Sequence, residues 1–87
     1  MTFVPPPEYD VPPSIPVIEK IMNLDEVSAL CAAKMNRALL PGQWIQGCTR
    51  VVNGTCYIWR IDDKITQRHE MAHCAGWPYN HPPYYRY

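Results

Sequence analysis

The chain has 87 residues, of which 47% are apolar and 18% charged, a balance typical of a folded domain rather than a disordered segment. Its length allows one small domain, whose core is marginal without extra constraints. Eight basic and eight acidic residues give a formal net charge of zero and form no basic patch, which argues against nucleic acid as a partner. No apolar run approaches the length of a membrane span.

Residues 1–18 form a proline-rich arm, with six of the chain's ten prolines in the first 16 positions. Proline fixes φ and lacks an N–H donor, so this arm should run extended and not as a helix or a central strand. Two roles suit it: a strap that docks on a partner or across its own domain, or a spacer.

A first helix is predicted from a cap at Asn23 or Asp25 to about Leu40. Glu26 follows Asn23 by three residues, as in a capping box, and Pro41-Gly42 stops the helix. Residues at a spacing of three to four give a stripe that is apolar except at one lysine. The stripe consists of Val27, Leu30, Cys31, Lys34, Met35 and Ala38.

Asn53-Gly54 predicts a β-hairpin between strands at 43–52 and 55–61. A two-residue turn pairs Val51 with Cys56 and Cys48 with Trp59, which puts the two cysteines on opposite faces of the hairpin. A bridge between Cys48 and Cys56 would then need a bulge or a longer loop.

Asp62-Asp63 is predicted to cap a second helix that runs to about Ala75 and ends at Gly76, with Pro78 beyond it. Three of its side chains should pack inward and anchor it. They are Ile65, Ala72 and Cys74.

All three histidines lie on this helix or just after it. His69 and His73 are one turn apart, so both imidazoles project from one face, and Glu70 lies about 100° round the helix, within reach of a water on a bound ion. If the chain turns back after the helix, His81 can approach the other two. Three neutral nitrogen ligands and an open fourth position predict a hydrolytic zinc site rather than a closed structural one.

Three other interpretations of these residues exist. A thermolysin-like site is disfavoured, because it takes a glutamate from a later helix as third ligand and no Asp or Glu follows Glu70. A closed site using Cys74 beside His73 is disfavoured, because neighbouring positions on a helix point about 100° apart. The remaining alternative is a chance H-E-x-x-H on a surface helix.

The run from His69 to Gly76, followed by a later histidine, resembles the H-E-x-x-H-x-x-G-x-x-H signature of the metzincin zinc metalloproteases. In that family the third histidine comes three residues after the glycine. Tyr79 occupies that position here, and His81 is the nearest histidine. The resemblance implies a reduced relative that binds Zn²⁺ through these three histidines, uses Glu70 as general base and cleaves peptide or protein substrates.

The predicted hydrolysis also gives roles to residues near the zinc. Arg68 or one of the tyrosines Tyr79, Tyr84 and Tyr85 would stabilise an oxyanion, although packing or interface contact is the other role for an aromatic tail at 82–87. Residues 57–61 would either bind substrate as an added strand, as an edge strand does in that family, or form a buried strand.

Four cysteines in so short a chain predict disulfides and an oxidising location, such as the periplasm, the extracellular space or a virion. No signal peptide is visible in the chain. Four reduced thiols in a cytosolic protein are the alternative. The pairing among Cys31, Cys48, Cys56 and Cys74 stays open, with Cys48–Cys56 the least favoured.

Together these features predict one small α+β domain at 19–81, with two helices, a hairpin, the arm at 1–18 and the tail at 82–87. The predicted function is zinc-dependent hydrolysis of a peptide bond. The alternative is a non-catalytic subunit, held by zinc or disulfides, that joins a larger assembly such as a virion or secretion complex through its arm and tail.

Overall fold

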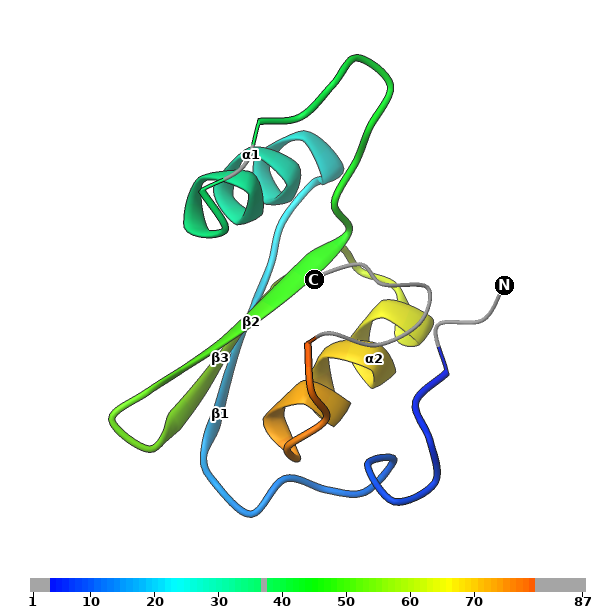
Figure 1. Cartoon of the computed structure of the whole chain (residues 1–87), viewed down its shortest axis with the longest axis vertical. Helices are drawn as coiled ribbons and strands as arrows, with labels where there is room; N and C mark the ends of the chain where they lie inside the picture. Colours follow the sequence, from blue (N-terminus) through cyan, green and yellow to red (C-terminus); the bar gives the residue numbers. More distant parts are fainter. Residues whose placement is uncertain (1–3, 37, 80–87) are drawn as a thin grey trace.

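A three-stranded sheet separates two helices in the computed structural model, which describes residues 4–36 and 38–79 (Figure 1). The elements follow the order β1 (Val17–Ile21), α1 (Leu24–Lys34), β2 (Gly47–Val52), β3 (Thr55–Arg60) and α2 (Lys64–Cys74). Helix α1 is bonded to β2 through Cys31–Cys48, and α2 is bonded to β3 through Cys56–Cys74. Because side chains alternate along strands, these two attachments lie on opposite faces of the sheet. The predicted α+β class is confirmed.

The hairpin has the predicted register. Asn53 and Gly54 take φ angles of 49° and 77°, as a tight hairpin turn requires, and β2 pairs antiparallel with β3. Val51 pairs with Cys56, and Cys48 pairs with Trp59. The strand order is β1-β3-β2, so β3 has a neighbour on each side. Because both edges of β3 are paired, the added-strand role considered for residues 57–61 is wrong. The strand is central in the sheet, and its side chains alternate between partly buried and buried.

Strand β1 was not predicted. It lies parallel to β3, with Val17 opposite Cys56 and Ile21 opposite Arg60, and its first two residues belong to the predicted arm. Its partner lies beyond α1 and β2 in sequence, so no local pattern indicates the pairing. An ion pair between Glu19 and Arg60 at 2.8 Å links the two strands through their side chains.

Helix α1 begins where expected and ends early. The side chain of Asn23 accepts a hydrogen bond from the backbone N–H of Glu26 at 2.9 Å, which confirms the cap. The helix ends at Lys34 rather than near Leu40, because Asn36 takes a left-handed φ of 51° that a helix cannot continue through. Its buried residues are Val27, Ser28, Cys31 and Ala32.

Helix α2 also begins at its predicted cap. Asp63 accepts hydrogen bonds from the backbone N–H and the hydroxyl of Thr66, and both hold the pKa of its carboxyl below the usual range. Ala72 and Cys74 pack inward, but Ile65 is 57% exposed, so that part of the prediction is wrong. The reason is that polar residues occupy the buried face. They are Thr66, His69, Glu70 and His73.

Two small hydrophobic clusters make up the core, and each contains one disulfide. One joins Cys31–Cys48 to Val27 and Ile45, and the other joins Cys56–Cys74 to Ile58. The disulfides are confirmed, the alternative of reduced thiols is wrong, and an oxidising compartment is compatible with both bonds.

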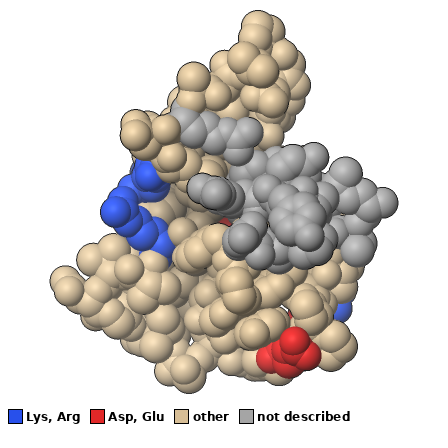
Figure 2. Space-filling view, viewed as in Figure 1, with Lys and Arg blue, Asp and Glu red and all other residues tan. Residues whose placement is uncertain are grey.

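Two surface properties bear on partners. Among the described residues, neither helix has the length and apolar character needed to cross a membrane. Among the described residues on the face drawn in Figure 2, most are uncharged, and basic side chains gather at one margin.

Candidate functional site

The imidazoles of His69 and His73 meet on the buried face of α2. Their Nε2 atoms are 3.2 Å apart, and the two residues are 5% and 4% exposed. The Nδ1 of His73 lies 2.8 Å from the carbonyl oxygen of Trp77. A carbonyl oxygen only accepts, so Nδ1 donates, and in the neutral ring Nε2 keeps a lone pair directed at His69. The space between the two rings therefore suits a shared proton or a cation.

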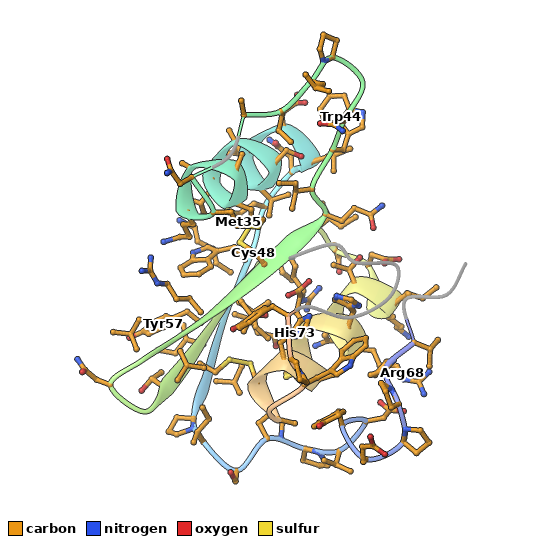
Figure 3. All side chains as sticks on the ribbon, in the orientation of Figure 1. Met35, Trp44, Cys48, Tyr57, Arg68 and His73 are labelled. Carbon is orange, nitrogen blue, oxygen red and sulfur yellow. A yellow bond between two sulfur atoms is a disulfide. The ribbon has the colours of Figure 1, made fainter. Side chains whose placement is uncertain are left out.

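Aromatic side chains that follow α2 hold these rings in place. Gly76 takes a φ of 105°, which ends the helix and turns the chain back over its own last turn. Trp77 and Tyr79 both lie parallel to the His73 ring, at centroid distances of 5.0 and 4.7 Å. Trp77 also meets His69 edge to face at 5.0 Å. The orientation of both imidazoles is thus fixed by packing and by the Trp77 carbonyl. Figure 3 labels His73 on this part of α2.

Glu70 lies beside the histidine pair and is only 2% exposed. One carboxyl oxygen accepts a hydrogen bond of 2.7 Å from the hydroxyl of Thr49 on β2, and the other lies 4.0 Å from the Nε2 of His69. Burial raises the pKa of Glu70 to about 7, and the bond from Thr49 partly opposes that rise. Such a carboxyl exchanges a proton readily near neutral pH.

The close fit of α2 on the hairpin brings Thr49 to this position. A Cβ atom at Gly47 would lie 3.0 Å from the Cγ2 of Thr66 and 3.1 Å from the carbonyl oxygen of Trp59, so any larger residue there would push these neighbours apart by a few tenths of an ångström. The disulfide Cys56–Cys74 fixes the other end of α2, one residue after His73. Thr49 was not identified from the sequence, since nothing local marks it as the partner of a carboxylate on another element.

Four residues of the predicted site lie close together in the structure: His69, Glu70, His73 and Tyr79. The Arg68 side chain instead binds Asp10 of the arm. The Nε of Arg68 donates to both carboxylate oxygens of Asp10, at 2.9 and 3.0 Å, and so ties the proline-rich arm to α2. Arg68 is thus engaged away from the histidine pair. The other predicted site residues, His81, Tyr84 and Tyr85, lie outside the described residues.

The hydroxyl of Tyr79 donates to the backbone carbonyl of Thr49 at 3.3 Å. Burial, and secondarily the negative charge of Glu70, raise the pKa of this phenol. The ring closes one side of a groove of about 650 Å³ that follows β2. The groove is lined by Lys34 of α1 and the following Met35, residues 48–51 of β2, His73, and residues 76–79.

Comparison of the chain with protein-family models, with curated proteins and with solved structures finds no match. In the described ranges 4–36 and 38–79, no three or more His, Cys, Asp or Glu side chains form a group that could hold a metal ion. All four cysteines are bonded in the two disulfides. The predicted membership in the metzincins is therefore wrong. The motif that suggested it spans little more than one helical turn. No family model matches the chain, and the part that the structure describes holds no three-ligand group.

Proposed function

We propose that His69 and His73 bind a divalent metal ion, with Zn²⁺ the expected one, and that the chain uses this site to hydrolyse a peptide bond. The observation that carries the proposal is the convergence of the two Nε2 atoms at 3.2 Å, with the Nδ1 of His73 donating to the Trp77 carbonyl. A hydrogen bond to the distal nitrogen is the usual support of a metal-binding histidine. The proposal rests on these side chains and carries no family assignment.

The donor set fits zinc in its chemistry. Neutral imidazole nitrogen is a preferred zinc ligand, and these two rings are buried and already oriented. His81, the predicted third ligand, lies outside the described residues and stays a prediction. A zinc ion held here would lower the pKa of water and polarise a carbonyl group.

Glu70 supplies the acid–base chemistry. Its carboxylate is oriented by the hydrogen bond from Thr49 and lies beside His69. It takes a proton from the attacking water and then delivers that proton to the leaving amine. Thr49 leaves the second carboxyl oxygen available for this exchange, since its hydroxyl bonds the first. The raised pKa of Glu70 suits a group that must both accept and donate a proton near neutral pH.

The burial of these residues argues against a chance motif on a surface helix. Two histidines and a glutamate that are each no more than 5% exposed carry a desolvation cost that the same helix would avoid with apolar side chains. Retaining them without a function would only weaken a domain whose core is already small.

The test is hydrolysis of a quenched-fluorescence peptide library by zinc-loaded protein, comparing wild type with Glu70→Gln. The variant should keep its zinc, because Glu70 is not a ligand, and should lose about 10²- to 10⁴-fold in rate. Glu8→Gln is the matched control, since Glu8 is an exposed carboxylate on the arm. Cleavage by Glu70→Gln at the wild-type rate would rule out the general-base role.

The second candidate function is a non-catalytic subunit of a larger assembly. It is favoured by two large apolar side chains on the loop between α1 and β2, Leu40 and Trp44, which are 65% and 52% exposed. Zinc binding without cleavage of any peptide in the library would favour this candidate.

A further inference from the structure

Two basic side chains line the groove along β2, and both come from the α1 side of the sheet. Lys34 stands at the end of α1, and Arg50 lies two residues after Cys48, on the face that Cys48 uses to reach Cys31. The same groove is lined by His73 and Tyr79 from the α2 side. It therefore passes from the histidine site, across β2, to a pair of cations.

No acidic side chain of the chain neutralises this pair. All eight Asp and Glu residues fall within the described ranges, and none of them lines this groove or the adjoining hollow that Lys34 and Arg50 share with Tyr57 and Trp59. The ion pairs among the described residues involve other cations. In Figure 2, which has the orientation of Figure 1, Lys and Arg side chains gather at the margin between α1 and the β2–β3 hairpin.

A ring contact orients Lys34, the first of the two cations. The Nζ of Lys34 lies 4.1 Å above the centre of the Trp59 ring, a contact that orients the ammonium group without removing its charge. The groove beside them also has apolar lining from Met35, Val51 and Trp77. An anion entering it would meet two positive charges next to low-dielectric surface, where their attraction is stronger than in bulk water.

We propose that Lys34 and Arg50 form a subsite for a carboxylate of the substrate, so that the chain favours peptides carrying an acidic group close to the cleaved bond. This inference rests on the proposed function and names the substrate class for the same site. Arginine binds carboxylates through paired hydrogen bonds, and a neighbouring lysine adds a second charge. The carboxylate belongs either to an acidic side chain or to the end of a peptide.

Three peptides of otherwise identical sequence separate these sources. The first has an internal glutamate and an amidated end, the second has glutamine in that place and an amidated end, and the third has the glutamine and a free carboxyl end. Zinc-loaded wild type should cleave one of the carboxylate peptides with a kcat/KM about tenfold above that of the neutral peptide. Raising the salt concentration should shrink that ratio.

The variant is Lys34→Ala combined with Arg50→Ala, and the matched control is Lys20→Glu, which changes an exposed lysine of β1 outside the groove. The double variant should bring the ratio of acidic to neutral peptide to about one, while the control keeps the wild-type ratio. Equal cleavage of all three peptides by wild type, or an unchanged ratio in the double variant, would overturn the subsite.

Binding measured without turnover separates failure of the subsite from failure of the proposed function. Fluorescence anisotropy of the three peptides with zinc-loaded Glu70→Gln protein should give about tenfold tighter binding of one carboxylate peptide, lost when Lys34 and Arg50 are also replaced. Preferential binding without any cleavage by wild type would keep the subsite and refute hydrolysis. Equal binding of the three peptides would refute the subsite, whatever the hydrolysis assay gives.

Discussion

The two helices have the same length, the same kind of cap and one disulfide each, but they bury different kinds of side chain. Each has 11 residues, begins at an Asn or Asp cap and is bonded to the sheet by one disulfide. Helix α1 buries Val27, Cys31 and Ala32 against one face, whereas α2 buries His69, Glu70 and His73 against the other. One sheet thus carries a helix that buries mostly apolar side chains and a helix that buries polar, ionisable ones.

The two buried faces differ in what they contribute to folding. Burying an aliphatic side chain such as Val27 contributes about 1.5–3 kcal/mol to folding. Burying a carboxyl group and two imidazoles gives no such gain and requires hydrogen-bond partners, which Thr49 and the Trp77 carbonyl provide. Helix α2 therefore gains less from apolar burial than α1, and the proposed metal site accounts for the polar side chains on its buried face.

Removing one disulfide at a time should have the largest effect on stability and should separate the two helices by their effect on zinc binding. Both Cys31→Ala/Cys48→Ala and Cys56→Ala/Cys74→Ala should lower the free energy of unfolding by about 3 kcal/mol, since the two bonds close loops of similar length. Only the second pair should also weaken zinc binding, because it releases the end of α2 next to His73. Urea unfolding and zinc titration of each variant measure the two effects. Equal loss of zinc affinity in both variants would show that zinc binding does not depend specifically on the attachment of α2 to the sheet.

Burial of the Glu70 carboxyl should make the free energy of unfolding depend on pH. The pKa of Glu70 is raised in the folded state from 4.5 to about 7, so its contribution to stability is full below pH 4.5 and is lost as pH rises through 7. Metal-free wild type should therefore lose on the order of 2–3 kcal/mol relative to Glu70→Gln between pH 4 and pH 8. Urea unfolding of both proteins at each pH isolates the effect of this one group. A difference that stays constant with pH would contradict the burial argument.

Truncating one apolar side chain on each helix should give the smallest losses of stability, and the loss should be larger on α1 than on α2. Val27→Ala should cost about 2 kcal/mol, because Val27 is fully buried in the α1 cluster. Ile65→Ala should cost less than about 0.5 kcal/mol, since Ile65 is mostly exposed on α2. Thermal unfolding of both variants provides the check. Similar losses would mean that α2 packs through Ile65 after all.

The parts of this fold that the sequence predicts are those fixed by local chemistry. Asn53-Gly54 alone sets the hairpin register, because a two-residue turn leaves no other pairing. Asn23 and Asp63 set the helix starts by capping the first turn. Strand β1 escapes prediction because its parallel partner is remote in sequence, and the end of α1 escapes because Asn36 could have continued the helix on propensity alone.

In the candidate site too, the features set by local geometry could be predicted from the sequence and those set by tertiary packing could not. The shared face of His69 and His73 follows from helical geometry, so their convergence could be predicted. Thr49 and the carbonyl of Trp77 belong to other segments and become partners only through tertiary packing. The family resemblance misled because a motif within one helical turn says little about the remaining chain.

Zinc binding by α2 is tested most directly by calorimetric titration of chelator-treated protein, in wild type and in the variants His69→Ala, His73→Ala and His81→Ala. Wild type should take up about one Zn²⁺ per chain. His69→Ala and His73→Ala should each bind at least about 100-fold more weakly. The His81→Ala arm reports whether that residue is the third ligand. Wild type that takes up no zinc, or His73→Ala that binds zinc as tightly as wild type, would contradict a metal site on this helix.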